Sequence, residues 1–375
     1  MLSRGLTQLP LAMAGIVLVD IALSFNVEVG MAGQINTASG LFSIFFGLAM
    51  GVLSVKYNHK SLLFTGVLLF VLVAVASFFS TSLLILIGVF SFVGIGNALV
   101  IPMVNTLIGE LVAPERRTSV IGMTVGGMSL IYFLGVLAAG FLSYLGWKLP
   151  MLLVIAPIGI ITGLICRNCI PSRDTGSDSQ ASFKDLFKGY MNVLRNKSAI
   201  GCLISTVLGF SVWYFYPVYG ASFFRQVYNI DPGMISTLVV FIILAFIMGS
   251  VSASRFVNRI GEKTTLVICT GIIGVFTILA FRVPSFYLAY LLSLAAGFAG
   301  GIMITASSSF ALSQIPEYSG TMMSIHAASD SFGFMISAGL GGTLLLLYGY
   351  DMGSTVLGVL GIIGAVILLI LTQKN

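Results

Sequence analysis

Twelve long apolar runs, separated by eleven short polar breaks, make up almost the whole chain. A helix needs about 20 apolar residues to cross about 30 Å of hydrocarbon, and the runs approach that length. Residues 62–79 and 356–371 are apolar on every side, whereas the strands of a membrane β-barrel alternate between apolar and polar residues. We therefore predict an all-α integral membrane protein with twelve transmembrane helices.

The composition excludes a soluble fold. Only 8% of the 375 residues are charged, whereas a soluble domain has about a quarter of its residues as Asp, Glu, Lys or Arg. Cys166 and Cys169 lack a second cysteine pair or a nearby histidine, so we expect no metal site and no disulfide framework. The chain also lacks a glycine loop that ends in Gly-Lys-Ser or Gly-Lys-Thr, so we expect no ATP and no other cofactor.

Lys and Arg divide unevenly between alternate breaks. If the N-terminus is cytoplasmic, all but three of the 18 fall on the cytoplasmic side, and the exceptions are Lys148, Arg225 and Arg282. Cytoplasmic loops of membrane proteins have such an excess. We predict a multi-pass protein of the inner or plasma membrane with both termini cytoplasmic. The net charge of +6 then follows from topology and needs no nucleic-acid partner.

The two halves of the chain repeat each other. The Pro-Glu pair at 114–115, after the fourth span, recurs at 316–317, after the tenth, and the breaks after spans two and eight match at nearly the same offset. Parallel repeats of this kind fold as two bundles that are related by an axis normal to the membrane. We predict two pseudo-symmetric six-helix bundles at 1–166 and 198–375, joined by a cytoplasmic linker with a short surface helix at 167–197.

The break after the second span has a distinctive pattern. It reads Gly51-Val52-Leu53-Ser54-Val55-Lys56-Tyr57-Asn58-His59-Lys60, and its counterpart after the eighth span reads Asn258-Arg259-Ile260-Gly261-Glu262-Lys263. These segments resemble the Gly-x-Leu-x-Asp-Arg-x-Gly-Arg-Lys loop of the major facilitator superfamily, although Val55 and Asn258 replace the acid. The Pro-Glu-Arg-Arg segment at 114–117 and Gly146-Trp147-Lys148 resemble its drug and metabolite proton antiporters. Gly135-Val136 stands where those exporters have Gly-Pro, and Phe90 stands where the family has an arginine on span four.

The resemblance implies a transporter and not an enzyme. In the superfamily two bundles rock about a central site, and the loop after the second span helps to latch one conformation by charge pairing. On the matching positions of this chain, the resemblance assigns this conformational latch to Lys56, Lys60, Arg117, Asn258, Arg259 and Gly261.

Acidic residues occur inside two apolar spans. Asp20 lies beyond the middle of the first span, and Asp330 lies within the eleventh, one helical turn after His326. A charge at the centre of a span costs about 2.5 to 3.5 kcal/mol, so such an acid needs a partner, a proton or a function. We predict that Asp20, His326 and Asp330 couple protons to solute movement. The alternative for His326 and Asp330 is a hydrogen-bonded pair that holds the eleventh span against its neighbours.

Aromatic residues gather on the seventh span around Pro217, which bends a helix. Rings with polar tips favour flat, lipophilic or cationic ligands through stacking and cation–π contact. We predict that solute is bound by Trp213, Tyr216 and Tyr219, with Ser308 from the tenth span. The alternatives are that the rings anchor the span at the membrane interface and that the serine bonds its own backbone.

These features favour a monomeric secondary transporter that exports a small amphipathic or lipophilic solute in exchange for protons. Import by proton symport and facilitative uniport stay open, because a protonatable Asp20 serves either direction. A membrane enzyme would need nucleophile, base and metal groups at one depth, and two histidines with four scattered cysteines supply too little. A receptor on a transporter scaffold is disfavoured because the chain contains no sizeable polar signalling segment.

Overall fold

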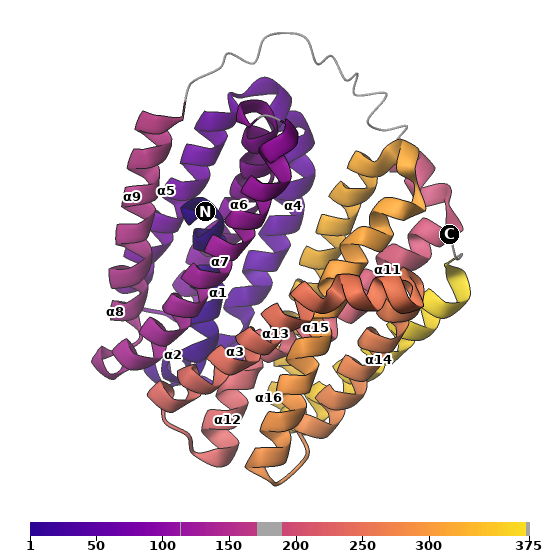
Figure 1. Ribbon diagram of the computed structural model, residues 1–375. Coiled ribbons are helices and arrows are strands. Elements are labelled where there is room, and N and C mark those ends of the chain that lie inside the picture. The colour runs from indigo at the N-terminus through magenta and orange to yellow at the C-terminus, as the bar shows by residue number, and fades with distance from the viewer. Residues whose placement is uncertain (113, 171–189, 373–375) are drawn as a thin grey trace. The chain divides into compact units, whose positions relative to one another are not determined.

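The computed structural model describes residues 1–112, 114–170 and 190–372, and every regular element in those ranges is helical (Figure 1). The prediction of an all-α protein is confirmed. The first half contains the helices α1 (Leu2–Ile16), α2 (Leu18–Ser24), α3 (Val29–Ala32), α4 (Gln34–Lys56), α5 (His59–Phe79), α6 (Leu83–Leu111), α7 (Pro114–Leu142), η1 (Ser143–Leu145), α8 (Lys148–Pro150), η2 (Met151–Ile155) and α9 (Ala156–Cys169). The second half contains α11 (Lys197–Trp213), η3 (Tyr216–Gly220), α12 (Ala221–Tyr228), α13 (Pro232–Ile260), α14 (Glu262–Ala280), α15 (Phe286–Gln314), η4 (Pro316–Tyr318) and α16 (Ser319–Leu371).

The described helices supply the twelve predicted crossings. Nine helical segments are long and apolar enough to cross a membrane, and α1 with α2 forms a tenth crossing that bends by 63°. At 53 residues, α16 would be about 80 Å long as one rod, which is more than twice the hydrocarbon thickness. Gly349 divides it into two crossings, since its φ of 81° is a conformation that residues with a side chain rarely adopt. The 23 residues of α4 complete the set.

The chain forms two compact units. The first consists of Met1–Ser179 with Phe224–Thr237, and the second of Gln180–Phe223 with Leu238–Asn375. The short segment 224–237, which contains the end of α12 and the start of α13, therefore belongs to the first unit although it follows the seventh span. The predicted bundle boundaries stay a prediction, and the surface helix expected in the linker lies outside the described residues.

Polar caps begin several helices at the predicted breaks. The side chain of Asn58 accepts a hydrogen bond from the Lys60 backbone N–H at 2.9 Å and starts α5, and Asn196 does the same for α11 through Ser198 and Ala199. Such caps satisfy N–H groups that have no partner within the helix. Gly261, between α13 and α14, has a φ of 85°, which explains why glycine stands in this tight connection.

Two helices of the second unit touch through their backbones. A Cβ on Gly249 of α13 would lie 2.0 Å from the Phe298 carbonyl oxygen of α15, and a Cβ on Gly301 of α15 would lie 2.0 Å from the Phe246 carbonyl oxygen of α13. Small residues allow such approach in lipid, where helices associate by packing and not by the hydrophobic effect. The glycines therefore fix the distance between α13 and α15.

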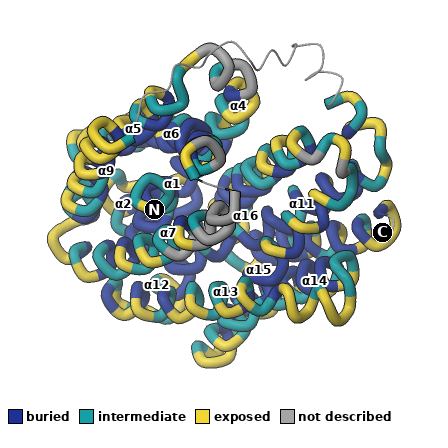
Figure 2. Tube along the Cα trace, turned by 45° about the horizontal axis from the view of Figure 1, so that its top comes forward, coloured by how far each residue is buried: buried dark blue, intermediate teal, exposed yellow. Residues whose placement is uncertain are grey.

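Exposed residues lie along the helices of both units (Figure 2), and many of them are large and apolar. Leu84 is 79% exposed in the first unit, and Val251 is 76% exposed in the second. A soluble protein rarely exposes extended apolar patches. Lipid solvates these side chains, and the helices satisfy the backbone hydrogen bonds that lipid cannot.

Candidate functional site

The predicted acid of the first span lies at a break in that span. Helix α1 ends at Ile16, and Asp20 lies in the first turn of α2, beyond a 63° bend. The last carbonyl groups of a helix lack partners within it, so the bend leaves backbone oxygens available beside the carboxylate.

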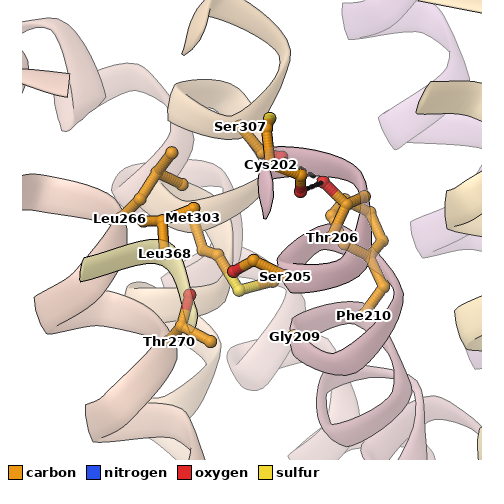
Figure 3. A pocket seen from close by; sticks show the side chains of 10 residues that line it. All are labelled: Cys202, Ser205, Thr206, Gly209, Phe210, Leu266, Thr270, Met303, Ser307 and Leu368. Atoms are coloured by element: carbon orange, nitrogen blue, oxygen red, sulfur yellow. Dashed lines mark hydrogen bonds between the residues drawn. The ribbon is translucent and has the colours of Figure 1, made fainter. Parts of the chain in front are cut away.

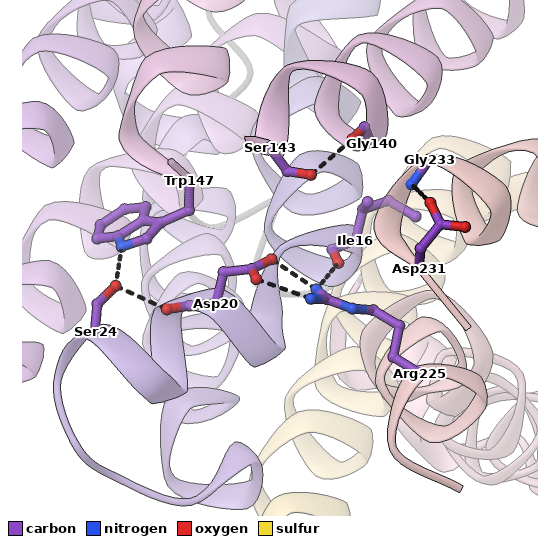
Figure 4. Close-up of polar contacts among 9 residues, drawn as sticks. All are labelled: Ile16, Asp20, Ser24, Gly140, Ser143, Trp147, Arg225, Asp231 and Gly233. Carbon is purple, nitrogen blue, oxygen red and sulfur yellow. Dashed lines mark hydrogen bonds and ion pairs between the residues drawn. The ribbon is translucent and has the colours of Figure 1, made fainter. Parts of the chain in front are cut away.

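Arg225 of α12 binds both the carboxylate of Asp20 and a backbone carbonyl oxygen at the end of α1 (Figure 4). Its Nη1 donates to Asp20 Oδ2 at 2.6 Å and its Nη2 donates to Oδ1 at 2.8 Å, while Nη1 also donates to the Ile16 carbonyl oxygen at 3.1 Å. The side chains of Arg225 and Asp20 are 10% and 25% exposed, and both residues belong to the first unit. Paired contacts of this kind between a guanidinium and a carboxylate are among the stronger polar interactions in proteins.

Two further contacts in the first unit surround this ion pair. The Trp147 indole N–H donates to Ser24 Oγ at 2.8 Å, and Ser24 Oγ donates to the Asp20 carbonyl oxygen at 2.8 Å, so α2 is fixed in place (Figure 4). The Tyr144 hydroxyl donates to Asp231 Oδ1 at 2.7 Å, and Asp231 also accepts from the backbone N–H of Gly233. The tyrosine hydroxyl, with help from backbone N–H groups, holds the pKa of the exposed Asp231 carboxyl below its usual value.

Asp330 of α16 has a neutral partner in the second unit. The Tyr214 hydroxyl donates to Asp330 Oδ1 at 2.8 Å. Tyr214 follows the last residue of α11, where the helix gives way to the π-helical turn η3. Its ring contacts Phe334 with centroids 5.0 Å apart and Phe210 with centroids 6.0 Å apart.

His326, one turn before Asp330, joins a separate chain of hydroxyl groups. Its Nε2 lies 2.9 Å from Ser307 Oγ of α15, which lies 3.4 Å from Thr206 Oγ1 of α11. Beside these hydroxyls is a cavity of about 10 Å³ (Figure 3), room for about a single water molecule. The polar residues that line it are Cys202, Ser205, Thr206, Thr270 and Ser307.

The predicted solute-binding residues lie in different surroundings. Trp213 stacks on Phe246 of α13 with centroids 5.1 Å apart, and Tyr216 lies next to it at 6.2 Å. Tyr219 is fully buried and its hydroxyl donates to the Ala338 carbonyl oxygen at 2.6 Å. The Ser308 hydroxyl donates to the Ile304 carbonyl oxygen one turn earlier, as in the backbone-bonded alternative. Their roles in binding stay predictions.

The contacts of Tyr219 predict a packing role, and a single substitution tests it. Tyr219→Phe should lower the free energy of unfolding by about 1 kcal/mol, because a buried carbonyl oxygen loses a donor. Thermal unfolding of the purified variant in detergent measures this. Solute affinity should stay at the wild-type value, and a large loss of affinity in a variant of normal stability would return Tyr219 to the binding site.

The residues of the predicted latch lie at helix ends. Asn258 and Arg259 are exposed in the last turn of α13, Gly261 makes the turn to α14, and Lys60 lies in the first turn of α5. The side chains of Lys56 and Arg117 lie outside the part of the chain whose side chains the structure describes. Their joint action stays a prediction.

Sequence reasoning missed two contacts at the start of α14, next to the turn at Gly261. Glu262, the first residue of α14, accepts hydrogen bonds from the hydroxyl groups of Ser309 and Ser313 of α15. Lys263 donates to the Thr372 carbonyl oxygen at 2.5 Å, at the end of α16. Ser309 and Ser313 are four residues apart and so face the same side of their helix, which is the one signal that the sequence offers.

No group of three or more His, Cys, Asp or Glu side chains within the described ranges could hold a metal ion. The described polar groups are instead an ion pair in the first unit and, in the second unit, a carboxylate beside a tyrosine and hydroxyl groups beside a histidine. Carboxylates and a histidine can exchange protons, and hydroxyl groups can form hydrogen bonds with polar solutes.

The comparison with protein families is decisive. The family model of the Major Facilitator Superfamily matches residues 1–226 and again residues 201–375. The chain belongs to this superfamily. The predicted recognition of the superfamily is confirmed, and membership in a group of transporters agrees with the prediction that the chain is not an enzyme. The narrower resemblance to drug and metabolite antiporters stays a prediction.

Relatives within the superfamily are distant. The chain is similar to the uncharacterised MFS-type transporter YfhI of Bacillus subtilis (strain 168), with 24% identity over 273 residues that cover 70% of this chain and 64% of that protein. The chain thus matches less than two thirds of the length of this superfamily relative.

Solved structures of the superfamily share the fold over nearly the whole chain. One is a bacterial homologue of the human lysosomal transporter Spinster, in an inward-facing and occupied conformation, with a TM-score of 0.79 and 15% identity over 100% of this chain and 95% of that one. Another is the nucleoside transporter NupG, with a TM-score of 0.76 and 13% identity over 100% of this chain and 99% of that one. At such identities the likeness concerns the fold alone.

Proposed function

We propose that this superfamily member is a secondary transporter, which moves a small amphipathic or lipophilic solute by alternating access and exports it in exchange for protons. The proposed partners are the solute, protons and the lipid bilayer, and the proposed state is a monomer in the inner or plasma membrane with both termini in the cytoplasm. On this proposal the latch residues Lys60, Asn258 and Arg259 lie on the cytoplasmic side.

The observation that supports this proposal best is the ion pair between Asp20 and Arg225. A carboxylate that takes a proton loses the charge that attracts the guanidinium, so a proton and Arg225 compete for Asp20. Arg225 lies in segment 224–237, whereas the preceding part of the seventh span belongs to the second unit. Protonation of Asp20 would therefore remove one of the contacts that hold the end of the seventh span in the first unit, which would link proton binding to a conformational change.

His326 and Asp330 form the second proposed proton-coupling group. They lie one turn apart on α16 and their partners, Ser307 and Tyr214, are neutral, so a change in protonation would not break an ion pair. The same contacts suit the alternative of a hydrogen-bonded pair that holds α16 against α11 and α15. Transport by His326→Asn and Asp330→Asn decides between the two roles.

Proton flux in liposomes tests the proposed function. Purified protein is reconstituted with a pH-sensitive dye trapped inside, and amphipathic solutes are added outside one at a time. Exchange predicts that entry of a transported solute makes the interior more alkaline, because protons leave as solute enters. Acidification would support symport, and solute entry without a change in pH would support uniport; either result would overturn proton-coupled exchange. Protein-free liposomes provide the baseline.

A further inference from the structure

The carboxylate of Asp330 has a hydrogen-bond partner on one of its two oxygens in the part of the chain that the structure describes. Its Oδ1 accepts from the Tyr214 hydroxyl, and its Oδ2 receives no hydrogen bond from the described residues. Among those residues no Lys, Arg or His forms an ion pair with it, whereas the other acid predicted to couple protons, Asp20, is held by Arg225. The residue is also only half-buried, and the described residues supply no counterion for its carboxylate.

Aromatic rings on two helices contact the tyrosine that binds this carboxylate. Phe210 precedes Tyr214 by one turn on the seventh span, and Phe334 follows Asp330 by one turn on α16. The Phe210 and Tyr214 centroids are 6.0 Å apart, and the Tyr214 and Phe334 centroids are 5.0 Å apart with the rings at 76°. Aromatic faces attract cations, and the attraction grows when water is excluded.

The helix that presents Tyr214 is interrupted at this point. Tyr214 follows α11, and residues 216–220 form a π-helical turn that contains Pro217. Interruptions and π-helical turns in membrane helices are frequent at binding sites, because the backbone there departs from regular hydrogen bonding. A half-buried carboxylate, a ring cluster and a broken helix therefore meet between α11 and α16.

We propose that Asp330, together with the ring cluster Phe210, Tyr214 and Phe334, binds the positively charged group of a lipophilic organic cation. This inference rests on the proposed function and names its solute class: molecules with a cationic nitrogen attached to an apolar body. The carboxylate supplies the counterion, the rings supply cation–π contact, and Tyr214 holds the carboxylate in position.

Binding of benzyltrimethylammonium to the full chain in nanodiscs tests this proposal. This probe has a permanent positive charge beside a phenyl ring, and neopentylbenzene has the same shape without the charge. Titration calorimetry should show saturable binding of the cation that the uncharged analogue does not displace. Asp330→Asn, which keeps the side-chain shape and an acceptor for Tyr214, should weaken the affinity by about tenfold or more, and Phe334→Leu by about threefold.

Two further variants show whether a loss of probe affinity comes from the lost charge or from altered folding. Asp330→Glu alters the packing but keeps the charge, so it should bind the probe at least about threefold more tightly than Asp330→Asn. Asp351→Asn removes an exposed acid that lies beyond the Gly349 break in α16, and it should leave the affinity unchanged. Equal affinity in wild type and Asp330→Asn, or the absence of binding to wild type, would overturn the proposal.

The binding experiment tests the cation site separately from the proposed exchange of solute for protons. Charge-dependent binding at Asp330 without proton flux for any solute would sustain the cation site and refute the proposed exchange. Proton flux with solutes, together with probe binding that Asp330→Asn does not weaken, would sustain the exchange and refute the cation site.

Discussion

Asp20→Asn should abolish uphill transport and leave downhill movement of solute intact. An asparagine cannot take up or release a proton, so the proton gradient can no longer drive solute uphill. The two bundles can still alternate, so solute can still move down its own gradient. A proton that moves down a pH difference of about 1.7 supplies about 2.3 kcal/mol, which sustains a solute gradient of about fiftyfold. The accumulation ratio in liposomes should therefore fall from about that value to unity.

Two further variants sharpen this test. Glu28→Gln removes another acid near the end of the same span, but Glu28 is exposed, so uphill transport should persist. Arg225→Gln keeps the titratable carboxylate and removes its competitor. That variant should let protons pass without solute, because α12 is no longer held when Asp20 is ionised. Proton-coupled accumulation at the wild-type level in Asp20→Asn would refute the role of Asp20.

Gly301→Ala should lower the stability of the protein by about 3 kcal/mol, as overpacking of a close contact does. The added Cβ would lie 2.0 Å from the Phe246 carbonyl oxygen and 2.7 Å from the Ser250 backbone nitrogen, and neither backbone atom can move without separating α13 from α15. The thermal unfolding midpoint of the purified variant measures the loss.

Gly271→Ala is the matched control for that substitution. Gly271 lies in α14, and its added Cβ would meet only the Ala365 side chain at 3.9 Å, which is an ordinary contact. Alanine also favours the helix over glycine by about 1 kcal/mol. The control should therefore melt at or above the wild-type temperature, and equal midpoints for the two alanine variants would show that the α13–α15 contact is not tight.

The crossings could be predicted from sequence because lipid imposes a simple rule. Every backbone group inside hydrocarbon must bond within its own helix, so an apolar run of sufficient length has few alternatives. The break near Gly349 illustrates this, since residues 348–353 are one of the eleven polar breaks in the sequence and the backbone leaves the helical conformation at that glycine. The bend between α1 and α2 was not predicted, because Val17 itself is neither proline nor glycine, although Gly15 lies two residues before it.

The site was harder to predict because it depends on how helices are rotated against one another. Asp20 needed a partner, but its partner Arg225 lies 205 positions further along the chain, and in the sequence it resembles any other loop cation. Ser308 was chosen in the tenth span, whereas Ser307 contacts His326. One residue is about 100° of rotation on a helix, and the spacing of apolar residues cannot resolve that angle when every side is apolar.

The membership of residues 224–237 in the first unit has a mechanical consequence. Apart from the linker, the polypeptide passes between the units at two places, after Phe223 and after Thr237. Any rocking of one unit against the other must flex the peptide at these crossing points. The π-helical turn at 216–220 lies just before the first of them, and on the proposed alternating access its irregular hydrogen bonding and Pro217 would let the seventh span bend there.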